Sequence, residues 1–186
     1  MFDASLAKYA EKVFSRQKIS IKTNHHVQKV TSEAVHTQED GEVPVGCVVW
    51  STGLAPNPLL TKALKGKLCL DERSSKIVVD DHLRACSVSE KSSTPCPLDD
   101  VFAIGDCAVI SGQELPATAQ VADQQAIWLG KTLNKTAAHK AAQGKPGSVN
   151  LQDEKKFRFR SLGIMAYLGG WRAITQSGGA ELKGYV

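Results

Sequence analysis

Residues 101–125, VFAIGDCAVISGQELPATAQVADQQ, decide the fold that this sequence predicts. They open with the short apolar run 101–104, which is too brief for a helix and ends at Gly105-Asp106, as a buried strand ending in a turn does. A helix is expected to begin near Pro116, because proline at the first helical position costs no hydrogen bond. This order of strand, turn and helix is typical of an open α/β sheet, which binds ligands beyond the carboxyl ends of its strands.

The turn between this strand and the helix has the residue types of a ligand site. Gly105 allows the backbone to come close to a ligand, and Asp106 offers an acceptor that suits a hydroxyl group. The amides at the start of the following helix carry partial positive charge and face the same crevice. We therefore expect one cofactor to be held here from two sides.

A helical wheel at about 100° per residue separates two faces of the helix. The predicted core face carries four apolar side chains, Ala122, Ala126, Leu129 and Leu133. Gln120 and Gln124 are four residues apart and lie together on roughly the opposite side. Neutral amides at this spacing are able to hydrogen-bond the two carbonyls of a quinone without burying a charge, whereas two solvent-facing glutamines are the simpler interpretation of spacing alone.

Two motifs in this stretch carry a family resemblance. FAIGDCA resembles the second flavin-binding motif of flavoproteins with two dinucleotide-binding domains, in which the aspartate holds the ribityl chain of FAD. LPATAQVADQQA resembles the quinone-site motif of the type II (alternative, rotenone-insensitive) NADH:quinone oxidoreductases, which belong to the pyridine nucleotide-disulfide oxidoreductase-like superfamily. The resemblance implies an α/β fold, part of a Rossmann-like protein with two dinucleotide-binding domains, with a β-rich segment at its C-terminal end.

The resemblance also implies the residues of the site. WSTG at residues 50–53 resembles the A-T-G motif beside the flavin. The implied FAD site comprises Thr52, Gly53, Gly105, Asp106, Ala119 and Gln120. Gln120 and Gln124 would line the quinone pocket. No side chain need act as an acid or base, because FAD carries the redox chemistry and NADH or NADPH is the electron donor.

The resemblance divides the chain into three parts. Residues 1–47 resemble the end of an NADH-binding domain, residues 48–145 the second half of an FAD-binding domain, and residues 146–186 a β segment that precedes a membrane-anchoring region absent from this sequence. No G-x-G-x-x-G occurs, although a pyrophosphate-binding Rossmann turn needs it or a near relative. We therefore expect a fragment or remnant of a longer enzyme that does not hold FAD tightly alone.

Periodicity predicts the remaining elements. An amphipathic helix is expected over residues 2–17, with Asp3 or Ser5 as its cap, and at most a short helix over residues 59–64. Residues 83–98 are rich in serine, proline and charge and predict an exposed loop. Strands are predicted at residues 19–23, 26–31, 45–50, 77–80, 156–160, 163–174 and 180–186.

Composition excludes several classes of protein. Apolar residues make up 42% and charged residues 23% of the chain, which is ordinary for a globular protein, and no run of about 18 apolar residues predicts a membrane span. The first residues lack the features of a targeting peptide. The 5 cysteines form no C-x-x-C pair or zinc spacing, and His25 and His26 have no partners at ligand spacing, so neither a metal site nor a redox disulfide is predicted.

Charge and the resemblance together indicate the partners. Basic residues outnumber acidic ones in residues 151–186, which favours either an anionic membrane surface or a solvated basic edge. KFRFR at residues 156–160 alternates basic and aromatic residues, but no RNP-like or zinc pattern accompanies it, so no nucleic acid partner is expected. The resemblance implies a quinone partner and a peripheral place at the inner mitochondrial membrane, and it allows a homodimer.

Two alternatives stay open at the level of sequence. One is another flavoprotein of the same architecture, similar to ferredoxin reductases or to apoptosis-inducing factor. The other is a non-catalytic interaction domain left by truncation. Activity with a soluble acceptor but none with quinone would favour the first alternative.

Overall fold

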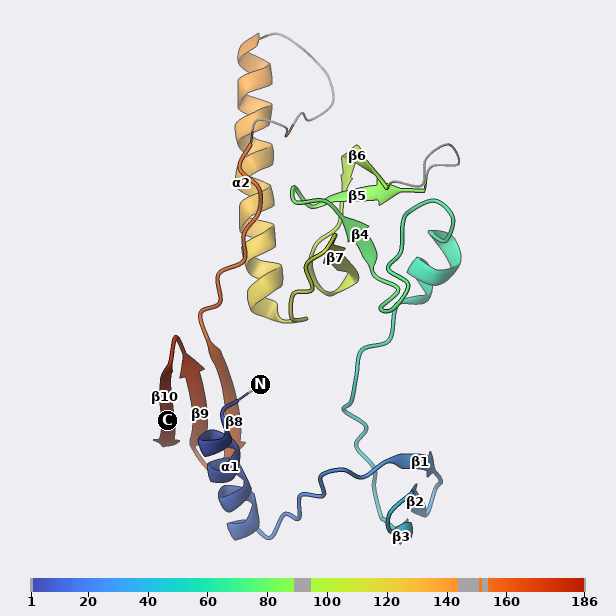
Figure 1. Cartoon of the computed structure of the whole chain (residues 1–186), viewed down its shortest axis with the longest axis vertical. Coiled ribbons are helices and arrows are strands. Elements are labelled where there is room, and N and C mark those ends of the chain that lie inside the picture. Colours follow the sequence, from blue (N-terminus) through green and yellow to red (C-terminus); the bar gives the residue numbers. More distant parts are fainter. Residues whose placement is uncertain (1, 89–94, 144–150, 152–153, 186) are drawn as a thin grey trace. The chain divides into compact units, whose positions relative to one another are not determined.

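The computed structural model describes residues 2–88, 95–143, 151 and 154–185, and the chain forms two compact units (Figure 1). The first unit comprises Met1–Gly53 and Leu162–Val186, and the second comprises Leu54–Ser161. Segments from both ends of the chain therefore fold together in the first unit. None of the helices in the described part of the chain is long and apolar enough to cross a membrane.

In the first unit, helix α1 (Ala4–Arg16) packs on a three-stranded antiparallel sheet of order β10-β9-β8. Leu6 and Val13 lie on the apolar face of α1 and are buried with Leu168 and Ile174 of the sheet. This confirms the predicted amphipathic helix. Asp3 occupies the N-cap position, but its side chain makes no capping bond, and its backbone N–H instead donates to the side chain of Gln176.

The C-terminal sheet consists of β8 (Ile164–Gly169), β9 (Arg172–Ser177) and β10 (Ala180–Tyr185). The turn between β9 and β10 is Gly178-Gly179, and both residues have positive φ, as the tight turns that match the twist of a hairpin require. This sheet confirms the strands predicted around the paired glycines.

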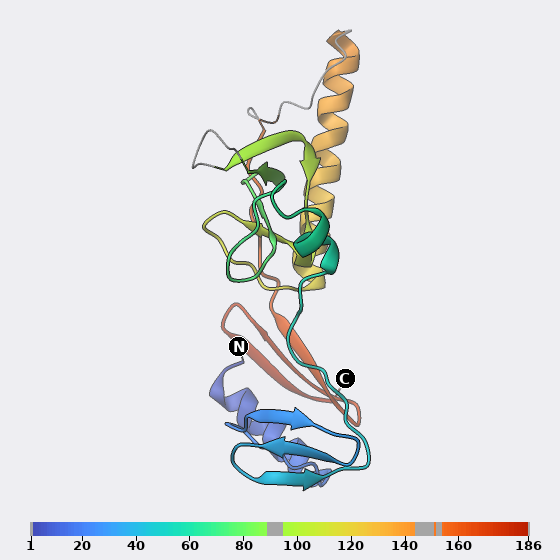
Figure 2. The same cartoon turned by 90° about the vertical axis from the view of Figure 1, so that its right-hand side faces the viewer.

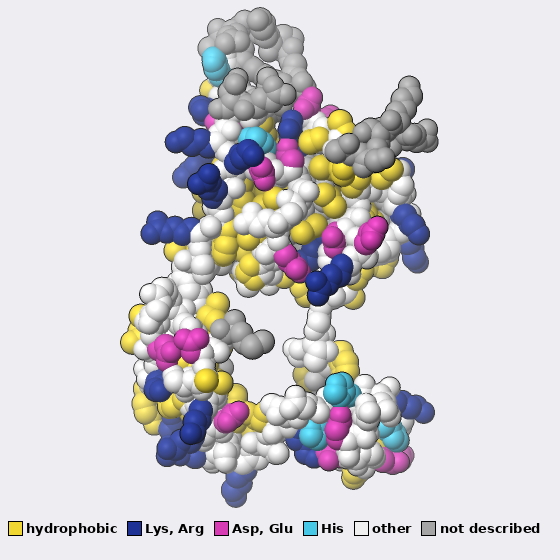
Figure 3. Space-filling model, viewed as in Figure 1, with side chains coloured by type: hydrophobic (Ala, Val, Ile, Leu, Met, Phe, Trp, Pro, Cys, Tyr) yellow, Lys and Arg dark blue, Asp and Glu magenta, His cyan; other side chains and the backbone are white. Residues whose placement is uncertain are grey.

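The first unit also contains a small antiparallel meander, β1 (Val27–Val30), β2 (Ala34–Thr37) and β3 (Gly41–Pro44) (Figure 2). Its imidazoles lie beside acidic side chains in the view of Figure 3. Glu39 accepts hydrogen bonds from the ring Nδ1 and the backbone N–H of His26, at 2.6 and 2.8 Å, and these bonds lower the pKa of Glu39. The strand predicted at residues 26–31 is confirmed.

Two strands predicted in the first unit are wrong. Residues 19–23 and 45–50 form no strand, and Val49 and Trp50 are 85% and 62% exposed. Their β-branched and apolar residues fit a strand, but a strand also needs a neighbouring chain for its backbone hydrogen bonds. No strand of the described residues pairs with either segment.

The second unit is built on a four-stranded sheet of order β6-β5-β4-β7 (Figure 1). Its strands are β4 (Ile77–Val79), β5 (Arg84–Ser87), β6 (Cys96–Phe102) and β7 (Ala108–Ile110). Strands β4 and β7 are parallel, whereas β5 is antiparallel to both β4 and β6. Val79, Leu83 and Ala85 are fully buried and form the centre of the core.

The structure confirms some predicted elements of the second unit and corrects others. Strand β4 and a single short helical turn, η1 (Leu59–Ala63), lie where they were expected. The exposed loop predicted at residues 83–98 is wrong over β5, whose Ala85 and Cys86 are buried, and over residues 96–98, which begin β6, while residues 89–94 of that prediction lie outside the described residues. The serine, proline and charged residues that suggested a loop mostly follow β5 in the sequence.

The strand predicted at residues 101–104 is the end of a longer one. Strand β6 begins at Cys96 and lies at an edge of the sheet, so Val101 is 39% exposed and only Ala103, beyond the strand, is buried. The expected buried strand is therefore correct in type but wrong in burial. An edge strand has a neighbour on one side only, and this leaves some of its side chains in solvent.

Helix α2 (Ala119–Gln143) differs from its prediction in start and in face. It begins after Thr118, whose backbone oxygen accepts the N–H groups of Val121 and Ala122, so Pro116 precedes the helix. The buried side chains are Val121, Gln125, Thr132 and Thr136, whereas Ala126 of the predicted core face is exposed. The wheel failed because it assigned the core by apolarity, and three of these four buried side chains are polar.

The strand predicted at residues 156–160 is also wrong. The described residues of this segment pair with no strand. The segment lies instead against α2 and the β4–β5 turn, where the Phe157 N–H donates to the carbonyl of Asp81 at 2.9 Å. Basic and aromatic residues alternate in this segment because one side of it contacts a helix and the other side contacts solvent.

We expect Leu83→Ala to lower the free energy of unfolding by about 2 to 5 kcal/mol, because it removes a fully buried side chain and leaves a cavity. The matched control is Leu59→Ala in the same unit, where the leucine is 59% exposed and the cost should stay within about 0.5 kcal/mol. Urea denaturation followed by far-UV circular dichroism measures both. Equal costs for the two variants would contradict the core described above.

Candidate functional site

The site lies where β6 ends and α2 begins. Between them run η2 (Gly105–Cys107), a single 3₁₀ turn, strand β7 and the loop that leads to Thr118. Gly105 has φ +74°, a backbone conformation that glycine adopts without strain. A Cβ added there would stand 3.5 Å from the Cβ of Ala122, so the turn packs directly on the first turn of the helix.

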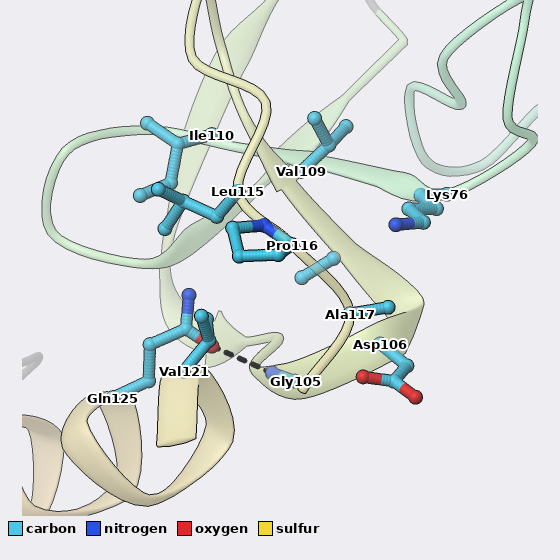
Figure 4. A pocket seen from close by; sticks show the side chains of 11 residues that line it. Lys76, Gly105, Asp106, Val109, Ile110, Leu115, Pro116, Ala117, Val121 and Gln125 are labelled. Atoms are coloured by element: carbon cyan, nitrogen blue, oxygen red, sulfur yellow. Dashed lines mark hydrogen bonds between the residues drawn. The ribbon is translucent and has the colours of Figure 1, made fainter. Parts of the chain in front are cut away.

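A buried glutamine fastens this turn to the helix. The side-chain oxygen of Gln125 accepts the backbone N–H of Gly105 at 2.7 Å, as the dashed line in Figure 4 shows. Gln125 is only 3% exposed, although the apolar pattern of the helix does not predict its burial. A buried amide is retained where it satisfies a backbone group that has no other partner. The burial of Gln125 could have been predicted from two observations together. Gln125 lies next to the apolar positions of the helix, and the backbone N–H in the glycine turn needs a hydrogen-bond acceptor.

Beside this link lies a cavity of about 10 Å³, bordered by Ile110, Leu115, Pro116 and Gln125 among others (Figure 4). That volume holds about one water molecule. The turn and the helix are therefore closely packed at this point, and a larger ligand has to lie on the other side of Asp106.

A larger cavity opens on that side. It has a volume of about 580 Å³ and is lined by apolar side chains that include Leu54 and Leu60, and by the charged side chains of Arg73, Lys76, Asp106 and Glu114. Asp106 is exposed, and in Figure 4 its carboxylate points away from Gln125. Ligand sites of this size are common. An apolar wall, two cations and the Asp106 carboxylate fit the flavin, phosphate and hydroxyl groups of the FAD that the resemblance predicts, and Glu114 adds a second carboxylate to the lining.

A tight turn carries the two cations to the cavity. Asp71 accepts hydrogen bonds from the hydroxyl and the backbone N–H of Ser74, at 2.6 and 2.7 Å, and the backbone oxygen of Asp71 accepts the N–H of Ser75. These bonds from Ser74 lower the pKa of the Asp71 carboxyl. The turn places Arg73 and Lys76 on the cavity wall, and neither residue belongs to a motif that the sequence would reveal.

The structure separates the predicted site residues into two groups. Gly105, Asp106, Ala119, Gln120 and Gln124 belong to the second unit and surround the start of α2. Thr52 and Gly53 are exposed residues of the first unit. The structure thus brings together the part of the site that the FAIGDCA and LPATAQVADQQA motifs encode.

The two predicted quinone glutamines have different surroundings. Gln120 is half-buried in the first turn of α2. The side-chain amide of Gln124 donates to the carbonyl of Arg160 at 2.8 Å and accepts the backbone N–H of Arg160 at 3.0 Å. Gln124 therefore holds the segment that follows the helix. The assignment of both residues to quinone remains a prediction.

Trp128, one turn further along α2, is part of the packing. Its ring lies edge-on to Phe157 with centroids 6.0 Å apart, and 6.2 Å from the ring of His82. The imidazole Nε2 of His82 lies 3.1 Å from the carbonyl oxygen of Glu154. Segment 154–161 is thus attached to α2 and to the β4–β5 turn at several points.

The cysteines form no disulfide, although Cys107 ends the η2 turn and lines the larger cavity. All five cysteines are free, and burial raises the pKa of the Cys86 thiol to about 11, so it stays protonated at neutral pH. Among the residues that the structure describes, no three His, Cys, Asp or Glu side chains lie together as metal ligands would.

Comparison with known families defines the class of the protein. The model of the pyridine nucleotide-disulphide oxidoreductase family matches residues 1–126, and the chain belongs to this family. A solved structure of NDH2 from Plasmodium falciparum in complex with NADH superposes with a TM-score of 0.75 at 18% identity, covering 98% of this chain and 48% of that one. This confirms the predicted α/β fold of a two-dinucleotide-domain protein.

Curated relatives are more specific. The chain is 32% identical over its whole length to a probable NADH dehydrogenase of Dictyostelium discoideum, and covers 36% of that protein. It is 33% identical, over 94% of its length, to a probable mitochondrial NADH-ubiquinone oxidoreductase of Schizosaccharomyces pombe, and covers 34% of it. These similarities confirm the resemblance to the type II enzymes, and the chain spans about a third of the length of the curated relatives it matches.

We expect Gln125→Met to lower the free energy of unfolding by about 1 to 3 kcal/mol, because it keeps the volume but leaves the Gly105 N–H without its acceptor. Amide exchange of Gly105, measured by NMR, should accelerate in the same variant. Asn134→Met, at an exposed position of the same helix, is the control. An unchanged exchange rate at Gly105 would rule out the link.

We expect Ser74→Ala to raise the pKa of Asp71 towards its ordinary value, because the variant removes the hydroxyl donor. The pKa of Asp71 is lower in the folded chain than in the unfolded chain, so the bonds from Ser74 stabilise the turn fully at pH values above the unfolded pKa of about 3.9. This stabilisation is lost as the pH falls through the folded pKa of Asp71. Carboxyl ¹³C NMR titration reports the shift. Ser75→Ala removes a hydroxyl from the next residue and should leave the titration unchanged.

Proposed function

We propose that this chain forms the flavin-facing and quinone-facing part of a type II NADH:quinone oxidoreductase. Such an enzyme passes electrons from NADH or NADPH through FAD to ubiquinone without pumping protons. The observation that carries the proposal is the Gly105–Asp106 turn, held by Gln125 against the start of α2 and open on its other side to the 580 Å³ cavity. The curated relatives, which are NADH dehydrogenases and NADH-ubiquinone oxidoreductases, support it.

Each part of the turn has a role in this proposal. The Asp106 carboxylate accepts a hydrogen bond from a ribityl hydroxyl, and Gly105 lets the backbone approach the cofactor. The N–H groups of Ala119 and Gln120, in the first turn of α2, supply partial positive charge that stabilises negative charge on a ligand in front of the helix. FAD, when bound, supplies the acceptance of hydride and the onward transfer of electrons.

The acceptor side of the site is proposed to lie along the same helix. Gln120 stands in its first turn and Gln124 one turn later, so a quinone headgroup beside them would lie near the flavin. Thr52 and Gly53 are also proposed to bind the flavin. Residues 1–47 would belong to the NADH-binding domain, which supplies the donor.

The cellular setting of the proposal follows from the relatives. The Schizosaccharomyces pombe protein is mitochondrial by name, and we propose that this chain belongs to an enzyme at the face of the inner mitochondrial membrane. The basic excess in residues 151–186 fits an anionic lipid surface. A homodimer is compatible with this arrangement.

Flavin binding tests the proposal directly. Riboflavin and FMN are titrated into the purified chain while flavin fluorescence is followed, and weak binding is expected. Asp106→Ala should weaken binding about tenfold, because a hydrogen bond to a charged group is lost. Asp123→Ala, which removes an exposed carboxylate from α2, should leave binding unchanged. Absence of any flavin affinity would refute the flavin site.

Turnover tests the acceptor. NADH oxidation by a full-length enzyme that contains this chain is followed with a short-chain ubiquinone, and separately with ferricyanide as a soluble acceptor. Loss of the quinone rate in Gln120→Ala, with the ferricyanide rate retained, is the expected result. Turnover with the soluble acceptor alone in the unmodified protein would instead favour a reductase similar to ferredoxin reductases or to apoptosis-inducing factor.

A further inference from the structure

His25 lies just before β1, in the segment that connects helix α1 to the meander of β1, β2 and β3. Nδ1 of its ring lies 2.9 Å from the backbone carbonyl oxygen of Thr23, and Nε2 lies 3.1 Å from Oδ2 of Asp40. The first contact closes a local turn in the segment. The second contact connects that turn to the loop between β2 and β3, which contains Asp40.

Both oxygens beside the ring of His25 are hydrogen-bond acceptors only. A backbone carbonyl and a carboxylate have no proton to donate, whereas a neutral imidazole carries a proton on only one of its two nitrogens. The neutral ring therefore makes one of the two bonds and turns a nitrogen lone pair toward the other oxygen. The imidazolium carries a proton on each nitrogen and makes both bonds. Protonation of His25 thus completes the bridge from Thr23 to Asp40.

The turn that the first bond closes has a backbone conformation that needs support. Asn24 has φ +58°, in the left-handed region that residues other than glycine adopt at some cost, asparagine more readily than most. Residues 19–24 are exposed and form no helix or strand. The bond from the His25 ring to the carbonyl of Thr23 spans Asn24 and offsets part of the cost of its conformation.

The charged groups around His25 come from the same two segments, and they gather over the meander (Figure 3). Lys22 pairs with Asp40, and this bond, together with the attraction of His25, lowers the pKa of the Asp40 carboxyl. Asp40 therefore stays ionised through the pH range in which a histidine titrates. Lys22 and an imidazolium at His25 repel each other, and the carboxylate that both contact offsets this repulsion.

A second histidine pair lies beside the first. The ring Nδ1 and the backbone N–H of His26 are bonded to the carboxylate of Glu39, in the same loop as Asp40. The ring of His26 has one acceptor in this pair, so a neutral imidazole with its proton on Nδ1 satisfies it. His25, with an acceptor at each nitrogen, is the histidine whose contacts require two protons.

We propose that His25 is a proton-dependent strap, which fastens the segment before β1 to the β2–β3 loop when its ring is protonated and loosens it when the ring is neutral. The strap is complete at acidic pH and loses one of its two bonds as the pH rises through the range in which histidine titrates, roughly pH 5 to 8. The connection between helix α1 and the meander is therefore held more firmly at acidic pH. This inference concerns the first unit and does not depend on the proposed function.

Amide exchange in the purified chain, measured by NMR, tests the strap. The N–H of Gln38 donates to the carbonyl of His26 at 2.9 Å, so its exchange reports separation of the two segments. After correction for the intrinsic pH dependence of exchange, protection of Gln38 should fall about two- to fivefold between about pH 5 and pH 8, because an exposed charged pair contributes modestly. The amides of β9, the central strand of the C-terminal sheet, are the reference for opening of the whole chain.

Two variants identify the groups that respond to pH. His25→Gln has no charge to change, and Asp40→Ala leaves the ring with a single acceptor that a neutral imidazole satisfies, so the pH dependence of Gln38 should disappear in both. The matched controls, His36→Gln and Glu42→Ala, remove a histidine and a carboxylate from β2 and β3 of the same meander. Both controls should retain the full pH dependence.

Three results would overturn the strap. Gln38 protection that does not change with pH in the unmodified chain is one, and a pH dependence that persists in His25→Gln is another. The third is a dependence that disappears in His26→Gln but not in His25→Gln, since it would then belong to the pair of His26 with Glu39. The amides of β9 show whether each variant folds, and Asp40→Ala tests the same bond from its other end.

Discussion

The hydrogen bond from the backbone N–H of Gly105 to the side chain of Gln125 is the interaction on which the site depends. It connects the end of a strand to the first turns of a helix at a point where the backbone turns through a positive φ. Because the link is buried, water cannot replace it at low cost. It leaves the carboxylate of the next residue, Asp106, free to face the open cavity, so one buried bond separates a rigid side of the turn from a side that can bind a ligand.

The features that the sequence predicted correctly are those that local chemistry encodes. Helix α1 follows from its apolar spacing, the β9–β10 turn from Gly178-Gly179, and the order of strand, glycine turn and helix from residues 101–125. The resemblance then named the family, which the comparisons confirm. Site residues within that local order, Gly105, Asp106 and Gln120, could be proposed because each follows from the motif that surrounds it, and their roles stay predictions.

The features that the sequence missed depend on partners distant along the chain. Residues 45–50 have the composition of a strand, but no described strand pairs with them. Residues 156–160 alternate between basic and aromatic side chains because one side of the segment packs against helix α2. Gln125 and Gln124 look alike in the sequence, yet one is buried against Gly105 and the other is bonded to Arg160. A helical wheel distinguishes faces by polarity, whereas the buried face of α2 includes polar side chains, of which Gln125 satisfies the backbone N–H of Gly105.

The sheet order β6-β5-β4-β7 has a consequence for how the second unit can be extended. Strands β6 and β7 are its outer members, and no other strand in the described residues hydrogen-bonds to the free side of either. An edge of this kind presents a row of unpaired backbone donors and acceptors. A further strand, from this polypeptide or from another, can therefore join the sheet beside β6 without breaking a bond described here, whereas beside β7 it would compete with the bond from the Gln113 N–H to the Ile110 carbonyl.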